Sequence, residues 1–360
     1  MMNTVFKDEL ARVAAMVGNE LNSDAFPEEV RPAVLGAAVR DYPCRGGKRL
    51  RPALVLWACE LFGGTPEQAL PAAVALEIYH NWTLVHDDII DRDDLRRGQP
   101  TTHVTLRQYA ESELNAPRER ASAFGESFAI LAGDVQQGWA VERLASVADR
   151  GVSPALALEL VRAMQTRLNR GLISGEALDV QFELLDPAAV TEEDVLRMID
   201  GKTGAIMEFA LHCGAAIALG AYEPDSAPFR ALSRYAKSLA RAFQLQDDVL
   251  GVFGDEKVFG KPLCSDFQEA KPTLLYIEAI RRLPTERRPE LDSLLRLPHY
   301  GDDEVRRVRD LLTSCGAADA VRSRIRNLSD DARAALRPLP ANSRRDLLDA
   351  LVATLIDRSV

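Results

Sequence analysis

Residues 72–85 read AAVALEIYHNWTLV, a segment whose apolar side chains would fall on most faces of a helix. Residues 239–250, LARAFQLQDDVL, have the same character. A helix that is apolar on most faces belongs in the interior of a protein. The two segments therefore predict two buried helices around which the rest of the chain packs.

Apolar residues recur at spacings of three and four along most of the chain, whereas sustained two-residue alternation is rare. Pro and Gly interrupt this pattern at short turns, and no interruption is long or polar enough to be a linker between domains. We find no repeat of fixed period. The pattern predicts an all-α protein in which residues 1–360 form a single domain.

Composition narrows the possible functions. The chain has 360 residues, 47% hydrophobic and 27% charged, with a formal net charge of −10. These values exclude disordered and fibrous classes, and the negative charge argues against a nucleic acid partner. No long apolar run or signal-peptide pattern is present, so we expect a cytoplasmic protein without stable membrane insertion. The five Cys lack metal-binding spacing and are expected to be free thiols.

An aspartate block follows the first buried segment: residues 86–91 read HDDIID. Asp87, Asp91 and Asp94 would share one helix face, with Asp88 flanking it. Like charges at this spacing, at the C-terminal end of a helix, destabilise the helix unless a cation is bound. Carboxylate oxygens are ligands that Mg²⁺ prefers. The block predicts a magnesium site, although a solvated acidic helix end would also explain it.

A second block, Asp247 and Asp248, ends the other buried segment and is preceded by Gln244. Charged groups are costly in a protein core unless they are paired or hold a metal. Two buried helices that each end in adjacent aspartates therefore predict two walls of one metal site.

Basic residues stand at short turns marked by glycine or proline. Lys48 and Arg51, at i and i+3, open a helix after Gly46 and Gly47. Similar turns read LRRGQPT at 95–101, GKTG at 201–204, GKP at 260–262 and KPT at 271–273. Glycine lets the backbone approach a phosphate closely, and a helix N-terminus attracts anions. Any one of these could be an ordinary basic turn, but together they predict diphosphate binding.

These motifs resemble those of the trans-isoprenyl diphosphate synthases, or polyprenyl synthetases. The resemblance rests on GGKRLRP at 46–52, HDDIIDRDDLRRGQPTTH at 86–103, GKTG at 201–204, FQLQDDVLGVFGD at 243–255 and GKP with Lys271. It covers about 40–280, and the helical tail, 281–360, is less diagnostic. It implies a helical bundle of the isoprenoid synthase type around a central cavity, usually as a homodimer. It also implies head-to-tail condensation of isopentenyl diphosphate with an allylic diphosphate.

The resemblance carries roles onto matching residues. Asp87, Asp91 and Asp247 would bind three Mg²⁺, supported by Asp88 and Asp248. The allylic diphosphate would be held by Arg96, Lys202, Thr203, Gln244, Lys261 and Lys271, of which Lys202 also acts in catalysis. Isopentenyl diphosphate would be held by Lys48, Arg51, His80 and Arg97. One departure is Gly251, where many members have a third Asp; Asp255 would take over its contact if the helix continues that far.

Product length in this family depends on the residues four and five before the first Asp, here Thr83 and Trp82. A bulky indole at the cavity floor, with Tyr79 one turn further down, predicts a short product, geranylgeranyl diphosphate in preference to farnesyl diphosphate. Trp82 could instead be ordinary core. The alternatives for the whole chain are a class I terpene cyclase, against which the second aspartate block and GGKRLRP argue, and a non-catalytic synthase subunit, against which the intact aspartates argue.

Overall fold

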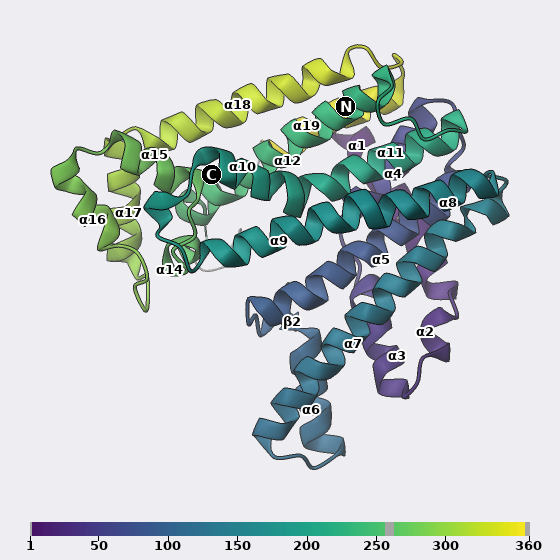
Figure 1. The fold of residues 1–360 in the computed structure, drawn as a ribbon, viewed down its shortest axis with the longest axis horizontal. Coiled ribbons are helices and arrows are strands. Elements are labelled where there is room, and N and C mark those ends of the chain that lie inside the picture. Colours follow the sequence, from purple (N-terminus) through teal and green to yellow (C-terminus); the bar gives the residue numbers. More distant parts are fainter. Residues whose placement is uncertain (1, 256–262, 357–360) are drawn as a thin grey trace. The chain divides into compact units, whose positions relative to one another are not determined.

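The computed structural model describes residues 2–255 and 263–356, with side chains from residue 4 onward. These residues form helices joined by short turns (Figure 1). The all-α fold predicted from the spacing of apolar residues is confirmed. Within the described ranges, the strands are limited to one short antiparallel ribbon, β1 (Leu95–Arg96) and β2 (Gln99–Pro100). No helix of the described ranges is both long enough and apolar enough to cross a membrane.

The described residues group into two compact units, the first running up to Ala163 and including Ala210–Glu223, and the second made of the remainder. The first unit contains α1 (Met2–Ser23), α2 (Phe26–Glu29), α3 (Ala33–Cys44), α4 (Leu50–Leu61), α5 (Pro66–Ile90), α6 (Thr102–Glu113), α7 (Arg118–Ala145), η1 (Ser146–Arg150) and α8 (Pro154–Ala163). The second contains η2 (Met164–Asn169), α9 (Arg170–Phe182), η3 (Pro187–Ala189), α10 (Glu192–Ile199), η4 (Asp200–Gly204), α12 (Ala227–Phe253), α14 (Ser265–Gln268), α15 (Leu274–Arg282), η5 (Thr285–Arg287), α16 (Arg288–Asp292), α17 (Asp302–Ser314), α18 (Ala317–Leu336) and α19 (Ser343–Ile356). Helix α11 (Ala205–Leu219) has residues in both units.

Helix α5 contains the first apolar segment that the sequence singles out, and most of its residues are buried. It begins with a cap, because the N–H of Thr65 donates to Oε1 of Gln68 at 3.3 Å. Helices α4 and α7 pack against it, and its residues 72–79 are almost completely buried. Each fully buried aliphatic side chain stabilises the fold by roughly 1.5–3 kcal/mol. Burial of α5 thus sets where its acidic C-terminal end emerges.

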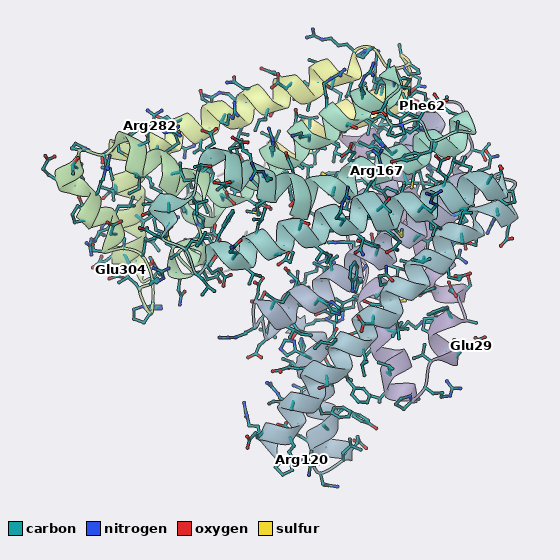
Figure 2. All side chains as sticks on the ribbon, viewed as in Figure 1. Glu29, Phe62, Arg120, Arg167, Arg282 and Glu304 are labelled. Carbon is teal, nitrogen blue, oxygen red and sulfur yellow. The ribbon has the colours of Figure 1, made fainter. Side chains whose placement is uncertain are left out.

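Helix α12 contains the second apolar segment and is the corresponding helix of the second unit. Helix α18 packs along it, and α19 also contacts it (Figure 1). The hydroxyl of Tyr235 in α12 donates to the carbonyl of Leu348 in α19 at 2.7 Å. The C-terminal tail therefore completes the packing around α12. Charged residues such as Glu29 in the first unit and Glu304 in the second project from the ribbon (Figure 2).

The C-terminal end of α12 is set by an arginine from α17. Arg309 donates from Nε to the carbonyl of Val252 at 2.7 Å and from Nη2 to that of Gly254 at 2.9 Å. These bonds satisfy carbonyls that a helix end leaves without partners. The helix stops at Phe253, so Asp255 lies beyond it and is exposed. The condition under which Asp255 would replace the missing aspartate, a continuing helix, is not met.

The GKTG motif forms a π-helical turn, η4, that packs closely against α9. A Cβ atom on Gly175 would lie 2.2 Å from the backbone nitrogen of Lys202, and one on Gly201 would lie 2.7 Å from the carbonyl oxygen of Gly171. No side chain fits at these distances, so glycine is required for the two backbones to meet. The same contact fixes the backbone that carries Lys202 and Thr203. Turns of this kind are frequent at functional sites.

We predict that Gly175→Ala lowers the free energy of unfolding by about 1–3 kcal/mol, because the new methyl group must displace the η4 backbone. The matched control is Gly138→Ala in α7, where an added Cβ meets no atom within 4 Å. That control should raise stability by about 0.5–1 kcal/mol, since alanine is the better helix former. Urea unfolding of both variants measures the difference. Equal shifts would contradict the close packing of η4 on α9.

Candidate active site

The first aspartate block lies at the C-terminal end of α5. Asp87 and Asp88 are in its last turn, and the N–H of Asp91 donates to the carbonyl of Asp87 at 2.8 Å. Asp87 and Asp91 are partly exposed, whereas Asp88 is only 1% exposed. Because α5 ends at Ile90, Asp94 is not on the helix face that the spacing predicted, and this part of the prediction is wrong. Its side chain is 72% exposed in the following turn.

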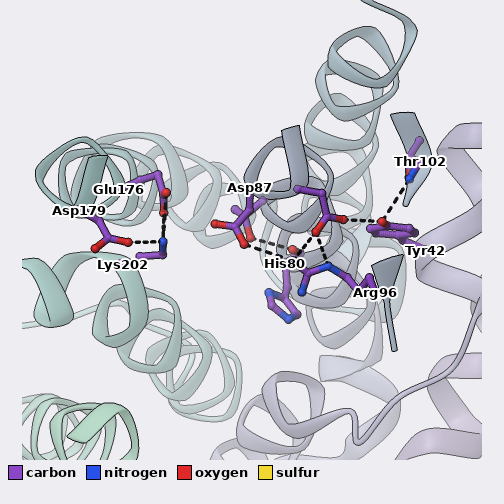
Figure 3. Close-up of polar contacts among 10 residues, drawn as sticks. Tyr42, His80, Asp87, Arg96, Thr102, Glu176, Asp179 and Lys202 are labelled. Carbon is purple, nitrogen blue, oxygen red and sulfur yellow. Dashed lines mark hydrogen bonds and ion pairs between the residues drawn. The ribbon is translucent and has the colours of Figure 1, made fainter. Parts of the chain in front are cut away.

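Asp88 is buried because two other elements satisfy its carboxylate (Figure 3). Arg96 donates from Nε to Oδ1 of Asp88 at 2.7 Å, and its Nη2 also lies 3.3 Å from Oδ2 of Asp87. The hydroxyl of Tyr42 in α3 donates to Oδ2 of Asp88. Burial, and then the contact with Asp88, raise the pKa of Tyr42, so this hydroxyl stays protonated. Asp88 therefore supports the site by holding Arg96.

The two-stranded ribbon presents Arg96 and Arg97 side by side in the sequence. Its turn residues, Arg97 and Gly98, both have positive φ angles, 53° and 74°, as a tight two-residue hairpin requires. Nη1 of Arg97 donates to the carbonyl of Gly46 at 3.1 Å. A Cβ on Gly47 would lie 3.0 Å from the same Nη1. The ribbon and the loop at residues 46–49 thus bring together basic residues that are about 50 positions apart in the sequence.

His80 lies in α5 among these guanidinium groups. Burial lowers the pKa of His80 well below its ordinary value, and neighbouring positive charges lower it further. Those charges belong to Arg51, Arg96, Arg97 and Arg49. A neutral imidazole in such surroundings suits a hydrogen bond to an anion. The structure therefore brings three predicted phosphate ligands, Arg51, His80 and Arg97, into one basic cluster with Arg96.

Arg51 is an incompletely paired member of this cluster. Its Nε is buried and has no hydrogen-bond partner among the described residues. Burial lowers the pKa of Arg51 to about 10, with Arg97 lowering it further and Glu77 opposing the change. A partly buried guanidinium whose Nε lacks a partner favours binding of an anion. Lys48, in contrast, lies exposed in the preceding loop.

The sequence alone did not identify the pair that holds this loop. Arg49, with a positive φ of 49°, is 5% exposed and forms an ion pair with Glu77 of α5. Its Nη2 also donates to the carbonyl of Pro43 at 2.7 Å, and Asn81 donates to Oε1 of Glu77 at 3.3 Å. A lone glutamate inside the apolar segment 72–85 is the signal that could have indicated a buried partner.

A small cavity lies beside the ribbon. Its volume is about 170 Å³. It is lined by Tyr42, Arg45, Asn81, Leu84, Arg96, Arg97 and Gln99. Pockets for larger organic ligands are roughly 300–1,000 Å³. The cavity therefore suits a compact anionic group more than a hydrocarbon chain.

The second aspartate block lies near the end of α12. Asp247 is partly exposed, and Asp248 is 7% exposed with Nε2 of Gln244 donating to its Oδ1 at 3.0 Å. Burial raises the pKa of Asp248 well above its ordinary value, and nearby carboxylates, Asp266 first, raise it further. The bond from Gln244 opposes this change, because it favours the charged form. A cation would remove this excess of negative charge.

Lys202 is held by two acidic residues that the sequence did not single out (Figure 3). Its Nζ lies 2.9 Å from Oε2 of Glu176 and 2.7 Å from Oδ2 of Asp179. Both carboxylates come from α9, and Asp179 also contributes to the raised pKa of Asp248. An acidic pair at i and i+3 directly after Gly175 is the pattern that could have indicated them. Lys202 thus lies near the second aspartate block, and its predicted role toward the allylic diphosphate stays a prediction.

The remaining predicted phosphate ligands of this unit are only partly described. Thr203 is partly exposed in η4. Nζ of Lys271 lies 2.8 Å from Oε2 of Glu269 and 3.7 Å from Oε1 of Glu183. Lys261 lies outside the described residues, so its predicted role stays a prediction.

The residues predicted to limit product length lie one and two turns before Asp87. The rings of Tyr79 and Trp82 meet edge to face at 4.8 Å between centroids. Trp82 is 7% exposed, and its Nε1 has no hydrogen-bond partner among the described residues. Thr83 instead donates its hydroxyl to the carbonyl of His80 at 2.8 Å. The aromatic pair therefore forms a rigid apolar surface next to the acidic end of α5.

The aspartates supply oxygen ligands of the kind that Mg²⁺ binds, but they do not by themselves fill its coordination shell. In the part of the chain that the structure describes, no three His, Cys, Asp or Glu side chains group closely enough to hold a metal ion. Mg²⁺ is commonly held by one or two carboxylates together with water and phosphate oxygens. Asp87 with Asp91, and Asp247, supply such oxygens, and the disfavoured charge of Asp248 fits a nearby cation.

Comparisons with known proteins identify the family to which this chain belongs. The chain matches the sequence model named polyprenyl synthetase over residues 32–312. A short chain isoprenyl diphosphate synthase of Methanocaldococcus jannaschii is 36% identical over 267 residues, which are 74% of this chain and 72% of that protein. A geranylgeranyl pyrophosphate synthetase from Pyrococcus horikoshii has a similar structure, with a TM-score of 0.82 and 31% identity over 98% of this chain and 99% of that one.

A geranylgeranyl pyrophosphate synthase from Corynebacterium glutamicum, solved in complex with isoprenyl diphosphate and magnesium, is also similar in structure. Its TM-score is 0.80, with 29% identity over 99% of both chains. The family match covers most of the chain, and it agrees with the motifs and with the basic and acidic clusters described above. The chain therefore belongs to the polyprenyl synthetase family.

Proposed function

We propose that this protein is a Mg²⁺-dependent trans-prenyltransferase that condenses isopentenyl diphosphate with an allylic diphosphate, and that its product is geranylgeranyl diphosphate. The observation that carries the proposal is the basic cluster around His80, built directly beside the acidic end of α5. A diphosphate bridged by metal ions needs both. The names of the two structural relatives, both geranylgeranyl pyrophosphate synthases, support the product length.

Three Mg²⁺ would be held by Asp87, Asp91 and Asp247, together with diphosphate oxygens. When bound, they stabilise the negative charge that develops on the departing diphosphate. Asp88 supports this end of the site by holding Arg96, and Asp248 supports the other through its bond with Gln244. The Corynebacterium glutamicum structure, solved with isoprenyl diphosphate and magnesium, supports magnesium as the metal and an isoprenyl diphosphate as the ligand.

The two diphosphates have separate sets of ligands in this proposal. The set for the allylic diphosphate is Arg96, Lys202, Thr203, Gln244, Lys261 and Lys271. The set for isopentenyl diphosphate is Lys48, Arg51, His80 and Arg97. The under-paired guanidinium of Arg51 and the neutral His80 are the features of this chain that favour the second set.

The reaction follows from these charges. The carbon–oxygen bond of the allylic diphosphate breaks as its negative charge is stabilised by lysine and arginine side chains. The double bond of isopentenyl diphosphate then attacks the allylic cation and forms the new carbon–carbon bond. Loss of a proton to the released diphosphate restores a double bond. Lys202, poised between Glu176 and Asp179, stabilises the departing group, and no nucleophilic side chain is required.

Farnesyl diphosphate synthesis is the second candidate, because the bulky Tyr79–Trp82 pair would also explain chain growth that stops at C15 and not at C20. Incubation with Mg²⁺, isopentenyl diphosphate and C5, C10 or C15 allylic diphosphates separates the possibilities by product length. Products ending at C20 from all three starters support geranylgeranyl diphosphate. A cyclic hydrocarbon would indicate a terpene cyclase, and no consumption of isopentenyl diphosphate would indicate a non-catalytic subunit.

We further propose that the chain acts as a homodimer and that residues 1–360 work as one synthase domain. Exposed apolar side chains on α7, Ile130 at 46% and Leu131 at 47%, support a protein partner on this helix. The family match at 32–312 runs through both compact units, which supports one functional domain.

We predict that Asp87→Asn lowers kcat roughly 10²–10³-fold, because it removes a metal ligand while keeping the side chain's shape. Asp94→Asn is the matched control: it lies in the same acidic block, but its side chain is 72% exposed beyond the helix end. The control should stay within about twofold of the unmodified enzyme. Steady-state product assays at saturating Mg²⁺ measure both. Equal losses would exclude a specific role for Asp87.

We predict that Trp82→Ala lengthens the product, because removal of the indole opens space below the acidic end of α5. Trp139→Ala is the control, since Trp139 is a buried indole whose Nε1 donates to Asp24 at 2.9 Å elsewhere in the first unit. Chromatography of the dephosphorylated products gives their chain lengths. Unchanged products from Trp82→Ala would show that Trp82 is ordinary core.

A further inference from the structure

Tyr42 connects three segments at the edge of the proposed site without being one of its predicted residues. It belongs to α3 and is 4% exposed. Its hydroxyl donates to Oδ2 of Asp88 in α5 and accepts from the backbone N–H of Thr102 in α6 at 3.2 Å (Figure 3). The guanidinium of Arg45 lies over its ring, 4.7 Å from the centroid. Both the ring and the hydroxyl are therefore fixed.

The direction of the hydroxyl proton follows from these contacts. Thr102 is the first residue of α6, where backbone N–H groups lack partners within the helix. Its N–H occupies the acceptor side of the hydroxyl, so the single proton of Tyr42 is directed to Asp88. Because the pKa of Tyr42 is raised, the proton is retained across the working pH range of an enzyme.

The two oxygens of Asp88 are used differently. Oδ2 receives Tyr42, whereas Oδ1 receives Nε of Arg96 at 2.7 Å. The Tyr42 bond thus sets the rotation of the carboxylate, and the carboxylate sets the plane of the guanidinium. Arg96 also lines the 170 Å³ cavity beside the ribbon. A guanidinium held in a fixed plane loses less entropy when it binds a phosphate.

We infer that Tyr42 is a positioning residue that acts through Asp88 to orient Arg96 for the allylic diphosphate. This inference rests on the proposed function, which places Arg96 on that substrate. Tyr42 lines the same cavity as Arg96, but its hydroxyl proton is directed to Asp88 and not into the cavity. Its hydroxyl contributes to affinity only because it keeps the Asp88–Arg96 pair in the orientation that binds diphosphate.

The test is Tyr42→Phe, which removes the hydroxyl and leaves the ring under Arg45. Because the variant loses a hydrogen bond to a charged group, we expect the KM for the allylic diphosphate to rise about tenfold. The KM for isopentenyl diphosphate should change by less than about twofold, because Arg51 and His80 are not hydrogen-bonded to the Tyr42–Asp88 pair among the described residues. A purely structural role would lower the melting temperature and the active fraction but leave both KM values unchanged.

Tyr276→Phe is the matched control. Tyr276 is also a buried tyrosine, 2% exposed, whose hydroxyl donates to an aspartate, Asp292, at 3.2 Å in the second unit. Its substitution should cost stability without changing either KM. The control therefore separates the general cost of losing a buried tyrosine–aspartate bond from an effect transmitted to Arg96.

A double mutant shows whether the effect passes through Arg96. In an Arg96→Ala background, Tyr42→Phe should change the allylic KM by less than about twofold, because there is no guanidinium left to orient. A full tenfold effect in that background, or no effect in the unmodified background, would overturn the inference. Absence of turnover by the unmodified enzyme would instead overturn the proposed function, so the two failures are distinguishable.

Discussion

The pairing of the buried Asp88 carboxylate is the interaction on which the cluster of charges in the first unit depends. A carboxylate in the core is costly unless every oxygen has a partner, and here Arg96 and Tyr42 supply those partners from separate elements. Helix α3 and the ribbon must therefore meet the end of α5 at one point. The neighbouring Asp87, which Arg96 also contacts, is partly exposed. The ion pair with Arg96 thus keeps Asp88 buried, while the neighbouring Asp87 stays partly exposed.

In the second unit, several carboxylates lie close to one another, and Asp248 is buried beside Asp266, Asp247 and Asp179. Burial and neighbouring carboxylates disfavour the charged form of Asp248, while Lys202 lies between Glu176 and Asp179. A ligand that brings both a cation and a phosphate satisfies the acids and the lysine together. The close contact of η4 with α9, possible only through Gly175 and Gly201, keeps these opposite charges at fixed positions.

Much of the fold could be predicted from the sequence, because the apolar segments at 72–85 and 239–250 are too hydrophobic to be anything but central helices. The acidic ends of the two helices could also be predicted, because an aspartate pair stands at the end of each segment. The residues at which the helices end were harder to predict from the sequence. Asp94 was assigned to the face of α5, and Asp255 depended on the length of α12, yet both lie beyond the last helical residue. Arg309, more than fifty residues away in sequence, helps to set the end of α12.

The sequence by itself determined the residue types of the site and their order, because glycine-marked basic turns and paired aspartates suit diphosphate and magnesium wherever the chain places them. Only the tertiary structure decided which charges meet. Tyr42 with Asp88, Arg49 with Glu77, and Lys202 with Glu176 and Asp179 join residues that are 23 to 46 positions apart. No local pattern encodes such pairs, since they result from the burial of whole helices, which forces each enclosed charge to find a partner.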